Sequence, residues 1–320
     1  MTFLRFLGNL LLAILLFVLI IAVLFTGCAI VLSTAWENVG LEHGVAEGAW
    51  LRIEDLPIYY RTAGPEAAPQ AVLVHGSGIE GSQTWNATIA ALSKAGVRVI
   101  AIDLKGYGYS GRDATPTHTL DRQVALLGKA LDDLQVKQAT IVGHDWGGAV
   151  ALQLASERPQ LVKGLVLVAP VLAPQPPLWQ RVARVPYLGR GAVWAISSGG
   201  PVWLFLRWRE FHNKAAFTSA YMREISQPTH IKGTVDTLLA MAASPQMRVS
   251  SRAIAAVQVP VLIIVGREDA PIFLETSQAL TKQISSARIV TVAGAGHYVH
   301  IEQGNQAHRQ IADFCLATAR

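Results

Sequence analysis

An aspartate stands at the centre of the sequence GHDWGG, in a pattern typical of a sharp turn that displays one reactive side chain. Gly143 and Gly147 lie two positions before and after Asp145, and their small size allows a strand to turn tightly into a helix. A carboxylate has an ordinary pKa of ~3.9, so Asp145 is ionised at neutral pH and attacks without a base. Such a nucleophile suits an sp³ carbon that bears a strained or good leaving group, and the product is an alkyl-enzyme ester.

Two later residues are candidates for the hydrolysis of such an ester. Asp269 follows the apolar run 259–266, within LIIVGREDAP, and His297 follows the run 288–294, within VAGAGHYVH. A histidine oriented by an acid can activate water as a general base. Glu268 is the neighbouring alternative for the acid, and Asp269 has a helix N-cap as its alternative role. The alternative for His297 is a histidine in a surface loop.

Alternating strand and helix patterns must position these residues. Short apolar runs, each typical of a buried strand, occupy 71–76, 97–104, 139–145, 165–170, 259–266 and 288–294. Apolar residues at helical spacing cover 119–134 and 149–156 between them. This alternation predicts an α/β fold with a doubly wound, mostly parallel sheet that is covered on both faces. Ligands bind beyond the carboxyl ends of such strands, and Asp145 lies at one of these ends.

A long segment without a convincing strand interrupts the alternation between residues 171 and 249. It contains seven prolines, four of the eight tryptophans and several helical stretches. Its length of ~80 residues greatly exceeds what a crossover helix needs. We therefore expect a helical insertion between two strands of the sheet, with aromatic side chains that line an apolar pocket or pack the insertion on the sheet.

Four stretches, in this order along the chain, resemble motifs of the α/β-hydrolase fold family, and the resemblance covers roughly residues 50–320. HGSG (75–78) resembles the loop that supplies an oxyanion donor, and DLKGYGYSG (103–111) resembles the loop after the next strand. GHDWGG (143–148) resembles the nucleophile elbow of the family, and GHYVHIE (296–302) resembles its catalytic histidine loop. Together they imply an α/β-hydrolase with a helical cap insertion.

The resemblance also implies roles for single residues. The family's chain order of nucleophile, acid and histidine corresponds here to Asp145, Asp269 and His297. The backbone N–H groups of Ser77 and Trp146 would form the oxyanion hole in which the ester is hydrolysed.

Two branches of this family use an aspartate nucleophile, the epoxide hydrolases and the haloalkane or haloacid dehalogenases. An epoxide oxygen needs a proton donor, usually a pair of tyrosines from the cap, and the candidates here are Tyr221 and Tyr187. A halide needs N–H donors, and Trp146 is the candidate. The chain departs from both branches at Ser77 and Gly78, where epoxide hydrolases usually have an aromatic residue and a proline and dehalogenases often have Asn or Glu at the first position. The resemblance therefore leaves the substrate open.

The N-terminus is strongly apolar, and it contributes to a hydrophobic content of 51% that is high for a soluble protein. Residues 6–32 contain no charged residue and exceed the ~20 apolar residues that cross a bilayer. We therefore expect residues 1–34 to form an uncleaved transmembrane anchor, with a cleaved signal peptide or lipid attachment at Cys28 as alternatives. Arg5 precedes the span and three glutamates follow it before Arg52, which favours a single-pass membrane protein with an extracytoplasmic body.

Charge and cysteine content speak against several other classes. The net charge is +5, the basic residues are scattered along the chain, and they form no nucleic-acid-binding motif. The two cysteines, Cys28 and Cys315, are not expected to form a disulfide, and no Cys/His cluster has metal-ligand spacing, so we expect neither metal nor cofactor. The densest basic group, LRWRE at 206–210, predicts an amphipathic helix with a solvated face, and attraction to anionic lipid is the alternative.

The sequence as a whole predicts a hydrolase that acts through an aspartyl alkyl-enzyme ester on a small apolar organic substrate and water, with an epoxide ahead of an organohalide. The first alternative is a dehalogenase or a carboxylic-ester type of hydrolase with another substrate. The second is a non-catalytic, membrane-tethered protein that binds a ligand. The expected boundaries are 1–34 for the anchor, 35–170 and 251–320 for the two parts of the core, and 171–250 for the cap. The oligomeric state stays open.

Overall fold

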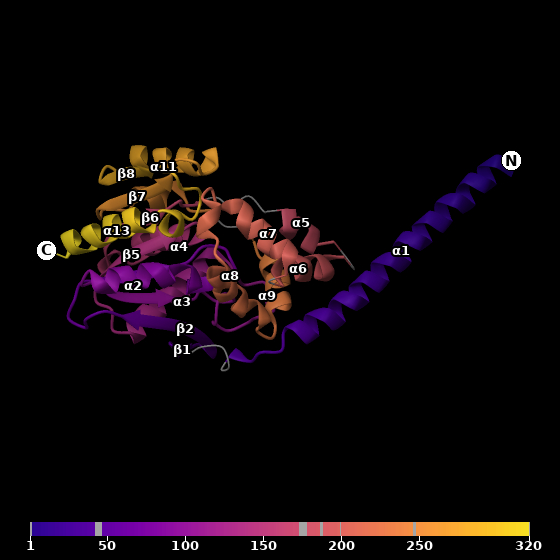
Figure 1. Cartoon of the computed structure of the whole chain (residues 1–320), viewed down its shortest axis with the longest axis horizontal. Helices are drawn as coiled ribbons and strands as arrows, with labels where there is room; N and C mark the ends of the chain where they lie inside the picture. Colours follow the sequence, from indigo (N-terminus) through magenta and orange to yellow (C-terminus); the bar gives the residue numbers. More distant parts are fainter. Residues whose placement is uncertain are drawn as a thin grey trace.

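The protein is described by a computed structural model that covers residues 2–41, 47–172, 178–185, 188–198, 200–245 and 248–319 (Figure 1). Its strands are β1 (Ala49–Ile53), β2 (Leu56–Ala63), β3 (Gln70–Val74), β4 (Arg98–Ile102), β5 (Ala139–His144), β6 (Val162–Val168), β7 (Val261–Gly266) and β8 (Ala287–Val292). Its helices are α1 (Thr2–Trp36), α2 (Asn86–Lys94), α3 (Leu120–Asp133), α4 (Trp146–Glu157), α5 (Leu178–Ala183), α6 (Gly189–Ser197), α7 (Pro201–Glu210), α8 (Ser219–Ser226), α9 (Thr234–Ala243), α10 (Ser251–Ala255), α11 (Pro271–Gln283), α12 (Val299–Glu302) and α13 (Gly304–Thr318).

One sheet organises the body, with the strand order β1-β2-β4-β3-β5-β6-β7-β8. The strands from β4 to β8 in this order are parallel, and β2 is antiparallel to both of its neighbours. Successive side chains of the central strands enter the apolar clusters on opposite faces, as Val72 and Leu73 do on β3. Both faces are therefore buried, which explains why these strands are continuous apolar runs.

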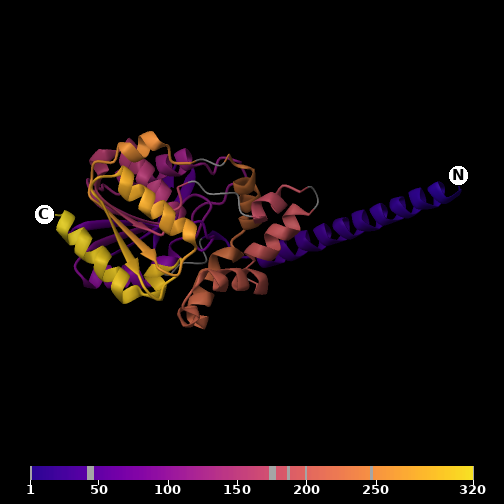
Figure 2. The ribbon, with the colours of Figure 1, turned by 90° about the horizontal axis from the view of Figure 1, so that it is seen from above.

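Helices cover the two faces of the sheet. Residues of α3, α4, α10 and α11 belong to the apolar cluster on one face, whereas residues of α2 and α13 belong to the cluster on the other. Figure 2 shows the sheet between these layers. The fold is thus the predicted α/β-hydrolase arrangement, and its central strands end on the side that carries Asp145.

The predicted strands and helices are found, and two further strands were not predicted. Each of the six predicted strands corresponds to one of β3 to β8, and the predicted helix at 119–134 is α3, whose N-terminus is capped by the Thr119 side chain. The sequence patterns did not predict β1 and β2. Pro57 and Arg61 interrupt the apolar character of β2, which is only partly buried and lies next to the antiparallel edge strand.

The predicted helical insertion lies between β6 and β7. Within its described residues it contains α5 to α9 and short 3₁₀ turns, and no strand. Figure 1 shows these helices between the sheet and α1. The insertion therefore forms a cap at the carboxyl end of the sheet.

Helix α1 extends away from the body (Figures 1 and 2). Among the described residues it is the one helix that is long and apolar enough to cross a membrane, although a signal sequence passes the same test. Its C-terminal half packs along α6. Directly after the last residue of α1, the carboxylate of Glu37 accepts hydrogen bonds of 2.8 Å from the backbone N–H groups of Gly233 and Val235, at the N-terminus of α9. The helix is therefore joined to the cap.

Candidate active site

The turn between β5 and α4 holds Asp145 in a strained backbone conformation. Asp145 has φ 50° and ψ −118°, a region that a residue with a Cβ atom rarely occupies. Such strain persists only where the surrounding structure enforces it, and it is concentrated at functional sites. The strain therefore marks Asp145 as a displayed side chain.

The glycines around Asp145 are required by close backbone approach. A Cβ atom on Gly143 would overlap the carbonyl of Gly147, and a Cβ atom on Gly147 would overlap the carbonyls of Val74 and His75 at the end of β3. The elbow therefore fits tightly against the loop that follows β3, and this loop carries Ser77 to the nucleophile.

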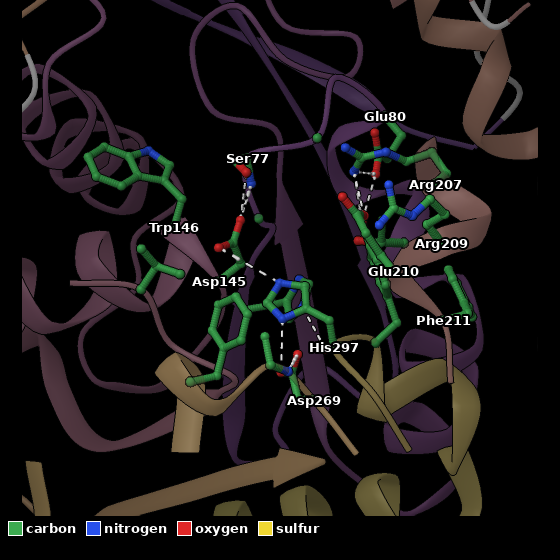
Figure 3. A pocket seen from close by; sticks show the side chains of 18 of the residues that line it. Ser77, Glu80, Asp145, Trp146, Arg207, Arg209, Glu210, Phe211, Asp269 and His297 are labelled. Atoms are coloured by element: carbon green, nitrogen blue, oxygen red, sulfur yellow. Dashed lines mark hydrogen bonds and ion pairs between the residues drawn. The ribbon is translucent and has the colours of Figure 1, made fainter. Parts of the chain in front are cut away.

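Ser77 makes two hydrogen bonds to the Asp145 carboxylate. Its backbone N–H donates to Oδ2 at 2.8 Å, and its hydroxyl donates to the same oxygen at 2.7 Å (Figure 3). The N–H group that the sequence suggested as an oxyanion donor therefore points at the Asp145 carboxylate. Trp146 is the first residue of α4, so its N–H has no intrahelical acceptor. The Ser77 hydroxyl is an additional polar group that the sequence alone did not identify.

The histidine and the second acid complete the constellation. Nδ1 of His297 lies 3.1 Å from Oδ2 of Asp269, and Nε2 lies 3.8 Å from Oδ1 of Asp145. Glu268, the alternative acid, instead accepts hydrogen bonds from backbone N–H groups of the loop before His297. Asp269, and not Glu268, is therefore the carboxylate in contact with the histidine, and three loops bring residues 145, 269 and 297 together (Figure 3).

The electrostatics of this group favour a charged pair. Burial acts to raise the pKa of Asp145, but the charge of His297 and the hydrogen bonds from Ser77 outweigh it, and the pKa lies below its ordinary value. Burial acts to lower the pKa of His297, but the hydrogen bond to Asp269 and the charge of Asp145 outweigh it, and the pKa is raised. Asp145 is therefore ionised across the physiological range.

Titration of His297 gives a direct check of this arrangement. We expect its pKa to lie above 6.5 in the free protein and to fall in Asp269→Asn and in Asp145→Asn, because each change removes a negative neighbour. Since the raised pKa belongs to the folded state, its contribution to stability is complete below pH 6.5 and is lost as the pH rises through the folded pKa. Nuclear magnetic resonance of the imidazole nitrogens measures these values. A pKa below 6.5, or one that Asp269→Asn leaves unchanged, would contradict the geometry.

Other histidines near the site support loops. Nε2 of His75 accepts the backbone N–H of Leu104, and Nε2 of His144 lies 3.1 Å from the carbonyl oxygen of His297. Burial, reinforced by the charge of His297, lowers the pKa of His144 to about 3. His144 is therefore neutral and positions the histidine loop. No group of three or more metal-ligating side chains occurs in the described part of the chain.

A cavity of about 1050 Å³ lies above Asp145. Asp145, Asp269, His297, Ser77 and Trp146 all line it. Figure 3 places the Trp146 ring on one side of the carboxylate and the charged residues of α7 on the other.

Of the two cap tyrosines that were candidates for contact with the leaving group, the structure describes one. Tyr221 packs edge-on against the rings of Phe211 and Phe217 and is not among the residues that line the cavity. Its placement is that of a packing residue, which does not support the predicted contact with a leaving group. Tyr187 lies outside the described residues.

A buried ionic cluster joins the cap to the core beside His297. Nη1 of Arg207 lies 2.9 Å from the Tyr298 hydroxyl, 3.2 Å from Oε2 of Glu210 and 3.5 Å from Oε1 of Glu80. Burial raises the pKa of Glu210, although Arg207 and His297 oppose it. Figure 3 shows this group above the histidine. The Glu80 side chain is buried, whereas those of Arg207 and Glu210 are 21% and 36% exposed, and the cluster links α7 to the core beside the cavity.

This cluster corrects the prediction of a solvated face for LRWRE at 206–210. Arg207 and Glu210 face the cavity, whereas Arg209 is exposed. The signal in the sequence is their spacing of three residues on a helix, which places both side chains on one face. Most other residues of α7 are apolar, so the periodicity of the sequence alone did not identify which face of this helix points inward.

Comparisons with known proteins support the hydrolase assignment. The sequence model of the Alpha/beta hydrolase family matches residues 71–313. A 2-hydroxymuconate semialdehyde hydrolase of Pseudomonas sp. is 30% identical over 256 residues, which are 76% of this chain and 85% of that protein. Epoxide hydrolase 3 of Siraitia grosvenorii is 37% identical over 110 residues, which are 34% of each chain.

A solved structure shares the architecture. The epoxide hydrolase CorEH superimposes with a TM-score of 0.70 at 21% identity, over 85% of this chain and 99% of its own. The sequence relative with the broader coverage is not an epoxide hydrolase, so the comparisons establish a hydrolase without singling out an epoxide substrate. The chain belongs to the α/β-hydrolase family.

Proposed function

We propose that this α/β-hydrolase uses the Asp145 carboxylate as a nucleophile toward an electrophilic sp³ carbon. The observation that carries the proposal is the position of that carboxylate. It stands at the apex of the elbow, ionised, with Oδ2 held by Ser77 and Oδ1 3.8 Å from the imidazole of His297. The bond between His297 and Asp269 supports catalysis over simple ligand binding, because a binding pocket needs no oriented base.

The proposed reaction has two steps. In the first, a carboxylate oxygen of Asp145 forms a bond to the substrate carbon, and the leaving group departs with its electron pair. In the second, water attacks the ester carbonyl and gives its proton to Nε2 of His297. The N–H groups of Ser77 and Trp146 stabilise the oxyanion, which collapses by breaking the bond to the alkoxy oxygen. That oxygen takes the proton from His297 and leaves as an alcohol, and Asp145 returns to a carboxylate by releasing its proton to water. An organohalide fits this scheme directly, because the halide leaves as an anion. An epoxide also fits it, provided that the alkoxide formed when the ring opens takes a proton from solvent water.

A second candidate is direct hydrolysis of a carbonyl substrate. It is favoured by the name and coverage of the Pseudomonas relative, a semialdehyde hydrolase that aligns with 76% of this chain. In this scheme Asp145 and His297 together remove a proton from water, and water attacks the substrate carbonyl. The substrate oxygen occupies the oxyanion hole. The tetrahedral adduct then collapses by breaking the bond to its leaving group, which takes the proton held by His297, and no ester forms on the protein.

A single turnover in ¹⁸O-labelled water separates these two candidates. With protein in excess over an epoxide, a bromoalkane, a p-nitrophenyl ester or a vinylogous keto acid, the consumed substrate identifies the class. We expect ¹⁸O to enter the peptide that contains Asp145, because water attacks the enzyme ester and the product takes its oxygen from the carboxylate. Label in the product with none in the peptide would reject the ester mechanism and support direct hydrolysis.

We also propose that α1 is a retained membrane anchor, because its C-terminal half packs against the cap. The less exposed positions of its C-terminal half are Ala22, Thr26, Ala29, Ser33 and Trp36, which follow the alternating four- and three-residue spacing of a helix contact stripe. Cleavage near Cys28 would remove part of this contact with α6, so the packing supports a retained helix over a cleaved signal. Arg5 before the span and the glutamates after it support an extracytoplasmic body.

A further inference from the structure

The exposed apolar side chains of the body are concentrated on the cap. Among the described residues outside α1, six large apolar side chains are strongly exposed, and five of them belong to the α5–α7 region. We call these five the cap apolar face: Val185, Leu188, Val202, Phe205 and Trp208. The exposed fractions of Val202 and Phe205 reach 50% and 55%. A concentration of this kind marks an interaction surface, whereas scattered apolar residues do not.

Among its described side chains, the solvent-facing side of helix α7 is mostly apolar, and Arg209 is its one charged member. Trp203 is buried, and Arg207 and Glu210 face the cavity, so the inward side of the helix is already packed. The outward side carries Val202, Phe205 and Trp208, which are members of the cap apolar face. A helix that is apolar on its outer side as well belongs in contact with another apolar phase.

The attachment of α1 indicates which phase this is. Both views of the ribbon show α5 to α7 on the side of the body from which α1 departs (Figures 1 and 2). Residues 6–32 are ~40 Å long as a helix, whereas a bilayer's hydrocarbon core is ~30 Å thick. The excess lies where α1 packs on α6, and Val23, Leu24 and Val31 remain exposed there. The apolar surface of the anchor thus continues onto the cap.

The charge of the cap complements an anionic lipid surface. Residues 178–214 contain six Lys or Arg and a single acidic residue, Glu210. Arg207 is paired with Glu210 in the cavity and Arg190 with Asp236 of α9, so four basic residues of this segment have no ion pair shown among the described residues. Arg209 and Lys214 are exposed, and the ammonium of Lys214 lies 4.1 Å from the ring centre of Trp208. Basic side chains beside exposed Trp, Phe and Val are typical of helices that lie in a membrane interface.

From these observations we propose that the cap apolar face lies in the interfacial layer of the bilayer that holds α1. The proposal depends on α1 being a retained membrane anchor, and it adds the cap apolar face as a second contact with the bilayer. The cavity rim includes Arg209, Lys214 and the exposed Ile272. The entrance to Asp145 therefore opens at the lipid surface, and its substrates are apolar or amphiphilic molecules that partition into the bilayer.

Site-specific fluorescence of the full chain tests this contact without any substrate. In a Cys28→Ser background, Phe205→Cys is labelled with an environment-sensitive dye, and Lys94→Cys on α2 is the matched control. The proteins are reconstituted in phosphatidylcholine vesicles with or without phosphatidylglycerol. We expect a blue-shifted emission at position 205 and severalfold stronger quenching by nitroxide-labelled lipid than at position 94. The effect is expected to be larger with the anionic lipid.

Each alternative result of these experiments contradicts a specific part of the proposal. If the full chain fails to float with vesicles after a carbonate wash, the anchor and the surface are both rejected. If it floats while position 205 is as hydrated as position 94, the surface is rejected and the anchor stands. If position 205 is shielded but not quenched by lipid, another protein or a second copy covers the face. None of these readouts depends on turnover, so the catalytic proposal is tested separately.

Discussion

In His297→Gln, we expect catalysis to stop at an ester on Asp145. Attack by the carboxylate requires no base, because the ordinary pKa of an aspartate lies well below neutral pH and the two hydrogen bonds from Ser77 favour its charged form. Hydrolysis of the ester does require a base, and glutamine does not accept the proton of water. Steady-state turnover should fall about 10²–10⁴-fold, the usual contribution of general base catalysis. Mass spectrometry of digested protein should find the alkyl group on the peptide that contains Asp145.

Two controls make the trapped ester specific. His212→Gln changes an exposed histidine at the cavity rim, and it should leave no adduct. The double variant Asp145→Asn/His297→Gln lacks the nucleophile and should also remain unmodified. If His297→Gln carries no adduct with any substrate that the parent consumes, the ester mechanism is wrong and the direct attack of water takes its place.

The central sheet and the elbow were predictable because their signals are local. A strand buried on both faces must be apolar throughout, and the elbow must have small residues at fixed distances from Asp145. The packing of Gly143 and Gly147 against neighbouring carbonyls explains why the short pattern GHDWGG was sufficient. The edge strands β1 and β2 lack such constraints, because they are partly exposed and paired in an antiparallel manner.

The buried ionic cluster was not predictable from local patterns. Arg207 meets Tyr298 and Glu80, which are distant in the sequence and are brought together by the docking of the cap on the core. The same docking places Tyr221 among phenylalanine rings, where the sequence suggested a contact with the substrate. Residues that act through tertiary contacts between the cap and the core were thus the ones for which composition and spacing gave no reliable guide.

The choice between a carboxylate and a hydroxyl at position 145 determines the chemistry of the site. The negative charge of Asp145 helps to raise the pKa of His297, which favours an imidazolium in the free protein. That state is unsuitable for deprotonating a serine. Esterification of Asp145 removes the charge and so lowers the pKa of His297, which makes the neutral imidazole available as a base when the second step needs one. The arrangement is thus coherent for an aspartyl ester and less so for an acyl-enzyme.

Replacement of the nucleophile tests this argument directly. In Asp145→Ser, we expect turnover of the parent's alkyl substrate to fall on the order of 10⁴-fold or more, as for removal of a catalytic nucleophile. Loss of the carboxylate should also lower the pKa of His297, since the charge of Asp145 is one cause of its raised value. The neutral imidazole can then activate the serine, and the amides of Ser77 and Trp146 are free to hold an oxyanion. A burst of p-nitrophenol from a p-nitrophenyl ester should therefore appear.

Asp145→Ala is the matched control, since it removes the carboxylate without supplying a hydroxyl, and it should neither turn over the alkyl substrate nor produce a burst. The comparison that decides the role of the aspartate is between parent and Asp145→Ser on both substrate types. If the parent consumes neither epoxide nor halide while Asp145→Ser hydrolyses esters, the aspartate is a replacement for serine and not an alkyl acceptor. If the parent consumes an alkyl substrate and the serine variant loses it, the carboxylate is the reacting group, because Ser77, Asp269 and His297 are unchanged between the two proteins.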